Sequence, residues 1–191
     1  MRNLYRCIVT ASYDRGIEHT LKMWPDVINA VPKAELHIFY GWQLFDQFYK
    51  DNPGSMMWKA NMVKMMKQPG IFEHGRVPQP QLAEEYKKSG IYVYSTHFGE
   101  INCISALKAQ YYGCEPVVIN YAALKETVHF GHRIEGDIYD DKVKEEFKSQ
   151  LIDALNNPMS DEKRAEMSEW AKQFEWSEIA KKWEVEFKNG L

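Results

Sequence analysis

The sequence predicts an α/β protein built as a Rossmann-like, doubly wound parallel sheet of about five to six strands, with a helical C-terminal tail. Short runs of β-branched and aromatic residues recur through the first 120 or so residues, and each is followed by apolar residues at helical spacing. Glycine or proline closes most of these segments. Right-handed crossovers would make such strands parallel and place helices on both faces. We therefore treat residues 1–191 as one domain, with a core over 1–158 and C-terminal helices over 159–191.

The first half of the chain alternates clearly. Residues 4–10 form a β-rich run that ends in a polar turn, 11–16. Apolar residues from Ile17 to Val31 then recur at helical spacing until Pro32, and residues 35–40 form a second strand that stops at Gly41.

The same alternation continues to the end of the core. Later strands are expected at 71–74, 90–95 and 115–119, and a polar stretch is expected at 131–141. The expected helices are a first one after Gly41 that breaks at 51–54, then 56–67, a helix around Leu82 to Tyr86, then 102–113, 143–155, and two segments within 161–188.

Composition excludes several classes of protein. The formal net charge is -3, so the chain lacks the strong basic field that sequence-independent binding to nucleic acid requires. The three cysteines, Cys7, Cys103 and Cys114, form no Cys-x-x-Cys pair and suit neither a disulfide framework nor a zinc site. No signal peptide and no apolar run of about 18 residues is visible. These features predict a soluble, cytoplasmic protein and leave attachment to a membrane surface open.

Four loops follow predicted strands and form the candidate site. Ligands of open α/β sheets bind at the carboxyl ends of the strands. The loops that follow those ends are 12–16, 41–42, 75–80 and 96–104.

Residues 98–109, continued by 113–118, resemble the donor-binding core of retaining GT-B glycosyltransferases, the group 1 or family 4-like enzymes. That core carries a Glu, seven residues and a second Glu, followed by a Gly and Pro-Val-Val. Glu100 stands at the first acidic position, whereas Lys108 stands at the second. The departure bears on how the ribose of a nucleotide would be held.

Four further segments resemble the same family, in the same order along the chain. They are the turn 14–16 after the first strand, the base-contacting turn 75–77, the loop 122–126 with alanines in place of two glycines, and the closing aromatic helix 174–180. In the family this core is the second of two Rossmann-like domains. The resemblance therefore implies a hexosyltransferase-type enzyme whose partners are a nucleotide sugar and an N-terminal acceptor domain that this chain does not contain. We expect the chain alone to bind donor but to turn over poorly.

The resemblance assigns roles to individual residues. Arg15 would neutralise the diphosphate and stabilise charge on the departing nucleotide, and Glu100 would contact the reacting end of the sugar. These two are the candidate catalytic residues. Asn102 is a plausible N-cap of a helix whose first amides would bind the diphosphate. The candidate substrate-binding residues are Ser12, Gly16, Gly41, Gly75, Arg76, Val77, Ile101, Asn102, Cys103, Ile104 and Lys108.

Lys108 replaces the carboxylate that accepts hydrogen bonds from both ribose hydroxyls in the family. An ammonium group is only a donor. Lys108 could donate to the hydroxyl oxygens, reach a phosphate, or pair with a carboxylate such as Glu100 or Glu126.

We expect no metal and no cofactor. His129 and His132 are three residues apart, but no carboxylate at ligand spacing accompanies them, and the resemblance implies metal-independent binding of the donor. A dehydrogenase is excluded because no Gly-x-Gly-x-x-Gly follows the first strand. The alternative function is a non-catalytic, degenerate Rossmann-like module for ligand sensing or protein contacts, which Lys108 and the alanines at 122–123 favour.

The C-terminal tail carries aromatic residues at helical spacing. This stripe either folds onto the chain's own sheet or leaves an apolar patch that would support a homodimer. Its members are Trp170, Phe174, Trp176, Ile179, Trp183 and Phe187.

Overall fold

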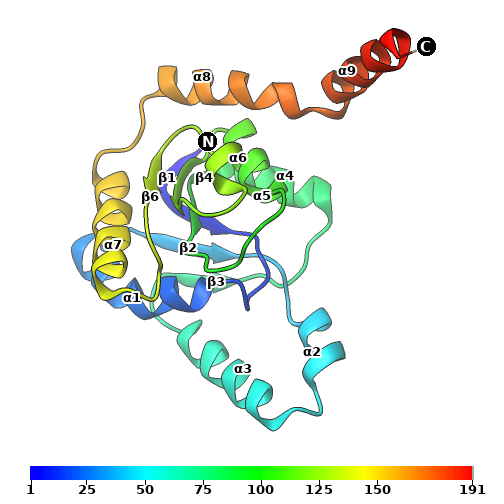
Figure 1. The fold of residues 1–191 in the computed structure, drawn as a ribbon. Coiled ribbons are helices and arrows are strands. Elements are labelled where there is room, and N and C mark those ends of the chain that lie inside the picture. The colour runs from blue at the N-terminus through cyan, green and yellow to red at the C-terminus, as the bar shows by residue number, and fades with distance from the viewer. Residues whose placement is uncertain (191) are drawn as a thin grey trace.

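A computed structural model describes residues 1–190 and contains one six-stranded parallel sheet in the order β3-β2-β1-β4-β5-β6. The helices lie on both faces of this sheet (Figure 1), so the predicted doubly wound α/β class is confirmed. The strands are β1 (Asn3–Val9), β2 (Glu35–Ile38), β3 (Ile71–Glu73), β4 (Ser89–Tyr94), β5 (Glu115–Ile119) and β6 (His132–Ile134).

Alternate residues of β1 feed two separate hydrophobic cores. Cys7 and Val9 belong to a core with buried residues of α1 (Ile17–Ala30) and α7 (Asp141–Asn156). Ile8 belongs to a core with buried residues of α4 (Gln79–Lys88) and α5 (Ile104–Tyr111). Because successive side chains of a strand point to opposite faces, the central strand must be apolar on both sides, as this one is.

Two helices after β2 form a hairpin that projects from the sheet (Figure 1). They are α2 (Gln43–Tyr49) and α3 (Pro53–Met65). The break predicted at 51–54 separates them, and Asn52 caps α3 by accepting a hydrogen bond from the Ser55 amide at 2.9 Å.

The polar stretch predicted over 131–141 contains β6, a strand that the sequence pattern does not predict. It has only three residues, and two of them, His132 and Arg133, are polar. An edge strand needs no apolar alternation on its solvent-facing side, so no pattern marks it.

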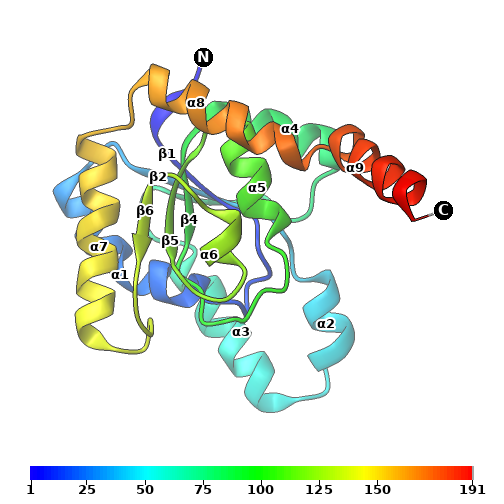
Figure 2. The ribbon, with the colours of Figure 1, turned by 45° about the horizontal axis from the view of Figure 1, so that its top comes forward.

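The tail divides into three elements rather than one continuous stripe: α8 (Asp161–Ala171), a 3₁₀ turn η1 (Lys172–Phe174) and α9 (Trp176–Asn189). Helix α8 lies across α5 (Figure 2) and is anchored by Arg164, which ion-pairs with Glu115 at 3.4 Å. Helix α9 extends away from the domain and buries none of its residues.

The aromatic side chains of the tail are divided in the same way. Trp170 packs against His129 with ring centroids 4.4 Å apart, whereas Trp176, Trp183 and Phe187 are 80%, 61% and 66% exposed. Part of the stripe therefore packs on the domain and the rest forms an exposed patch. The homodimer expected of that patch stays a prediction.

No helix within residues 1–190 combines the length and the apolarity that crossing a bilayer requires.

Candidate functional site

The carboxyl edge of the sheet contains a topological switch point between β1 and β4. The chain runs outward from β1 to β2 and β3 on one side, and from β4 to β5 and β6 on the other. The loops after β1 and β4 therefore leave the sheet in opposite directions and open a crevice between them. Arg15 lies in the first of these loops and Glu100 in the second.

The structure brings these two candidate catalytic residues together. Arg15 Nη1 lies 3.1 Å from Glu100 Oε1 and 3.3 Å from Oε2. The Tyr94 hydroxyl donates to Glu100 Oε1 at 2.6 Å, and the Arg15 guanidinium lies 4.1 Å from the centroid of the Phe98 ring. Burial and the hydrogen bond to Glu100 raise the pKa of Tyr94, so its hydroxyl remains a donor at neutral pH. Sequence reasoning missed Tyr94 because it reads as an ordinary strand residue.

Gly16 allows the turn after β1 to approach β4. Its φ is +110°, and a Cβ there would lie 2.2 Å from the carbonyl oxygen of Ser95. The Ser95 hydroxyl donates to the Gly16 carbonyl at 2.8 Å and shares a 2.7 Å hydrogen bond with Thr20. Only glycine fits this approach, and the approach is what brings Arg15 to Glu100.

A tyrosine–glutamate link joins the other loops at this edge. The Tyr13 hydroxyl donates to Glu73 at 2.6 Å and accepts from the Gly41 amide at 2.9 Å. Glu73 also accepts from the Gly75 amide at 3.0 Å. The predicted site residues Gly41 and Gly75 therefore lie in one network, and their amides are engaged within the protein. Ser12 closes the neighbouring turn through its carbonyl, which accepts from the Arg15 amide at 3.0 Å.

A small cavity of about 140 Å³ lies between the loop after β3 and helix α5, and we call it the β3–α5 cavity. Its walls include four predicted site residues: Arg76, Val77, Ile104 and Lys108. Lys108 Nζ donates to Gln79 Oε1 at 2.6 Å across this cavity. Of the three alternatives considered for Lys108, pairing with Glu100 or Glu126 is not the one found, because its amino group lies on the side of α5 that faces α4.

The N-terminus of α5 differs in detail from the sequence prediction. The helix begins at Ile104, and its N-cap is Cys103, which makes no side-chain cap hydrogen bond. Asn102 is not the N-cap, because its carbonyl instead accepts the Ile104 amide at 3.0 Å in a tight turn. Ile101 is 98% exposed. Burial raises the pKa of the Cys103 thiol to about 11, so this residue can contribute its amide but no thiolate at neutral pH.

The loop 122–126 keeps a backbone conformation that usually requires glycine. Ala122 has φ of 50°, the one positive φ outside glycine among residues 1–190. The Ala123 amide donates to the Glu100 carbonyl at 3.1 Å, so this loop supports the loop that carries the carboxylate.

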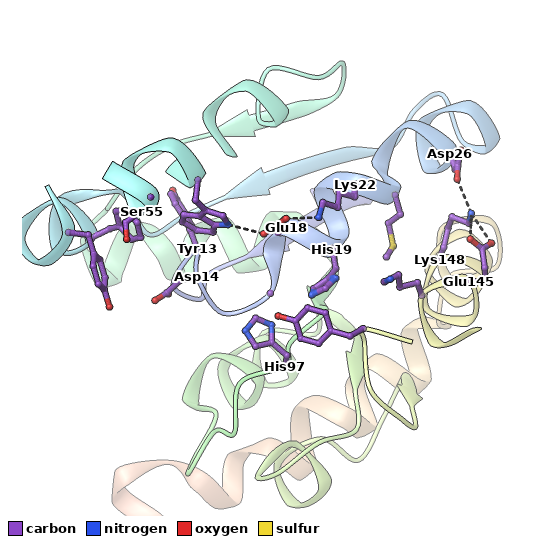
Figure 3. A pocket seen from close by; sticks show the side chains of 18 residues that line it. Tyr13, Asp14, Glu18, His19, Lys22, Asp26, Ser55, His97, Glu145 and Lys148 are labelled. Carbon is purple, nitrogen blue, oxygen red and sulfur yellow. Dashed lines mark hydrogen bonds and ion pairs between the residues drawn. The ribbon is translucent and has the colours of Figure 1, made fainter. Parts of the chain in front are cut away.

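A larger cavity of about 730 Å³ lies on the α1 side of the same edge, and we call it the α1–α7 cavity. Of the predicted site residues, only Gly16 lines it. Figure 3 shows His19 of α1 and His97 of the loop after β4 turned toward each other at this cavity, with ring centroids 5.9 Å apart. Sequence reasoning missed the α1–α7 cavity because its walls come from segments far apart along the chain.

Among residues 1–190, no three His, Cys, Asp or Glu side chains are placed together to hold a metal ion. Metal independence stays a prediction.

A family model described as glycosyl transferases group 1 matches residues 3–174. No curated protein matches the chain. Solved structures that match include a pneumococcal O-GlcNAc transferase, GtfA, in complex with UDP and GlcNAc, with a TM-score of 0.72 and 14% identity over 98% of this chain and 36% of that one.

Two further crystal structures show the same similarity. Anabaena HepE in complex with UDP and glucose matches with a TM-score of 0.66 and 12% identity, over 99% of this chain and 49% of that one. The catalytic domain of starch synthase IV from Arabidopsis thaliana, bound to ADP and acarbose, matches with a TM-score of 0.64 and 13% identity, over 98% of this chain and 38% of that one. At these identities the similarity establishes the shared fold, and this chain spans less than half the length of each of these proteins.

Proposed function

The chain belongs to the group 1 glycosyl transferases, and from that premise we propose that it is the donor-binding domain of a retaining, GT-B-type enzyme. It would bind a nucleotide-diphosphate sugar at the carboxyl edge of the sheet and act together with an N-terminal acceptor domain. The observation that carries the proposal is the Arg15–Glu100 pair at the switch point, beside the β3–α5 cavity.

The diphosphate would take the place of Glu100 as the partner of Arg15. The Arg15 side chain is 37% exposed, so a ligand can reach it without unfolding the loop. Two donors of a guanidinium fit two oxygens of a phosphate as well as they fit a carboxylate. As the bond between the anomeric carbon and the phosphate oxygen breaks, charge builds on the leaving nucleotide, and Arg15 would stabilise it.

Glu100 would then turn to the sugar. Its side chain is 12% exposed and keeps the hydrogen bond from Tyr94, so it remains positioned when Arg15 changes partner. A carboxylate in this place accepts hydrogen bonds from sugar hydroxyls and orients the reacting carbon.

The nucleoside would occupy the β3–α5 cavity, with the base beside Arg76 and Val77. Lys108 and Gln79 close one wall together. The amide oxygen of Gln79 can accept a hydrogen bond from a ribose hydroxyl, which the ammonium group of Lys108 cannot do. This pair would replace the single carboxylate of the family.

The matched structures agree with this chemistry, because those proteins were solved with UDP or ADP bound. The competing function is a degenerate, non-catalytic module. The observation in its favour is that Lys108 and Gln79 bond each other across the β3–α5 cavity and narrow it.

Isothermal titration calorimetry with UDP, GDP, ADP, CDP and dTDP separates the two functions. We expect at least one nucleoside diphosphate to bind, and Arg15→Ala to weaken it by about tenfold or more, the loss of one charge-assisted contact. Arg133→Ala on β6, away from both loops, is the matched control and should bind as the unmodified chain does. Binding of none of the five by a folded chain would overturn the proposal.

A further inference from the structure

The α1–α7 cavity lies next to the candidate donor site but does not contain the Arg15–Glu100 pair. It is about five times the volume of the β3–α5 cavity, 730 against 140 Å³. Cavities of several hundred cubic ångströms hold ligands larger than one small ring. The donor proposal leaves this space unused.

Most of the fixed charges on its walls are paired within the protein. Lys22 Nζ lies 2.5 Å from Glu18 Oε1, and Lys148 Nζ lies 2.8 Å from Asp26 Oδ2 and 2.8 Å from Glu145 Oε2. Figure 3 shows Lys148, Asp26 and Glu145 at the end of the cavity that is far from Tyr13. Paired lysines attract a polyanion weakly, which disfavours nucleic acid and phosphorylated ligands.

The same pairs offer donors and acceptors side by side. Each ammonium group has three N–H donors and each carboxylate about four lone-pair sites, so one partner does not saturate either group. Burial lowers the pKa of His19 to about 4, and its neutral ring at pH 7 adds one donor and one acceptor. A ligand whose groups both donate and accept, such as a polyhydroxylated ring, matches this wall.

Aromatic rings on the cavity pack against neighbouring side chains. The Trp58 indole N–H donates to Glu18 Oε2 at 2.8 Å, and its ring packs 5.3 Å from that of Phe45. Tyr139 is 58% exposed and meets His19 edge-on at 4.9 Å and His97 at 5.2 Å. Rings that are fixed before binding lose little conformational entropy when a ligand packs on their faces.

We propose that the α1–α7 cavity binds an uncharged oligosaccharide, with Trp58 and Tyr139 as stacking platforms and the paired charges as hydrogen-bonding groups. A pyranose ring presents an apolar face of C–H bonds and an edge of hydroxyl groups, which are the two features these walls complement. The inference goes beyond donor binding and does not depend on it.

The α1–α7 cavity borders the candidate donor site. Tyr13 and Gly16 line it from the loop that carries Arg15, and His97 lines it from the loop that carries Glu100. One end of a bound glycan would therefore lie beside the reacting pair, and the glycan would extend over α1 toward α7.

The test uses the full chain without any nucleotide, so it stands whether or not a donor binds. The fluorescently labelled chain is applied to an array of neutral and acidic glycans, and the best neutral oligosaccharide is titrated while the indole N–H signals are followed by NMR. We expect the Trp58 signal, identified with Trp58→Phe, to shift, and Tyr139→Ala to weaken binding by about tenfold, as for loss of one stacked ring. Trp183→Ala on α9 is the matched control and should bind unchanged.

Each other result overturns the inference. If the chain bound no neutral oligosaccharide on the array, or bound acidic glycans alone, the α1–α7 cavity would not select uncharged sugars. Equal binding by Tyr139→Ala, with no shift of the Trp58 signal, would place the sugar elsewhere. Because Tyr139 lies exposed in a loop, its variant is expected to fold, and a thermal melt checks this.

Discussion

Gly16→Ala gives the sharpest test of how the candidate site is built. Alanine at the φ of +110° found here is strained, by about 1–2 kcal/mol for a left-handed residue. Its Cβ would also lie 2.2 Å from the Ser95 carbonyl oxygen and 2.8 Å from Thr96 Cα, both backbone atoms that cannot rotate away. Relieving such overpacking costs about 1–3 kcal/mol more. We expect the free energy of unfolding to fall by about 2–5 kcal/mol in total.

Gly75→Ala is the matched control. Gly75 also has a positive φ, +67°, but nothing lies within 4 Å of the position its Cβ would take. Gly75→Ala introduces the backbone strain of a positive φ without any steric overlap, so we expect the free energy of unfolding to fall by about 1–2 kcal/mol. Urea unfolding followed by circular dichroism measures both variants at constant m-value. If Gly16→Ala were no less stable than Gly75→Ala, the close approach of the β1 turn to β4 would be refuted.

Three further predictions follow from the same geometry. Glu100→Gln should tighten binding of a nucleoside diphosphate about two- to fivefold, because the substitution frees Arg15 from a part-exposed ion pair. Weaker binding in calorimetry would contradict the proposed change of partner by Arg15. Ala122→Gly should raise the melting temperature by about 2–4 °C, because it removes about 1 kcal/mol of backbone strain at a residue with positive φ. An unchanged melting temperature would show that the loop is unstrained. The free energy of unfolding should fall as pH drops from about 6.5 to about 4, because burial lowers the pKa of His19 and His37 to about 4 and the unfolded chain binds more protons in that range. His19→Asn should make the free energy of unfolding depend less steeply on pH. An unchanged pH dependence would exclude His19 as its source.

The fold was largely predictable because strong periodic patterns mark its central elements. The runs around Ile8, Ile91 and Val117 are apolar on both sides, as parallel strands between two helix layers must be. The edge strand at 132–134 could not be predicted, since its pairing depends on a neighbour rather than on its own pattern.

Site residues whose positions depend on the order of the strands could be predicted from the sequence, whereas contacts between individual side chains could not. Arg15 and Glu100 come together because both follow strands at the switch point. The partner of Lys108 is Gln79, from a helix that enters the site from the other side of the cavity. Local spacing carries no information about such a contact, and the family pattern has a carboxylate at position 108, so it gives no partner for a lysine there.

The contact between Tyr13 and Glu73 illustrates the same limit. The two residues are 60 positions apart and come together only when β1, β2 and β3 pair side by side. The walls of the α1–α7 cavity are assembled in the same way, from helices on one face and loops at one edge.

In the proposed function, a nucleotide-diphosphate sugar is held at the carboxyl edge of the sheet between β1 and β4. A crystal structure of the chain with its best-binding nucleoside diphosphate tests this most directly. We predict the base beside Val77 in the β3–α5 cavity and the diphosphate on Arg15, with the Arg15–Glu100 ion pair broken. A nucleotide bound elsewhere, or bound with that ion pair intact, would contradict the proposed donor site.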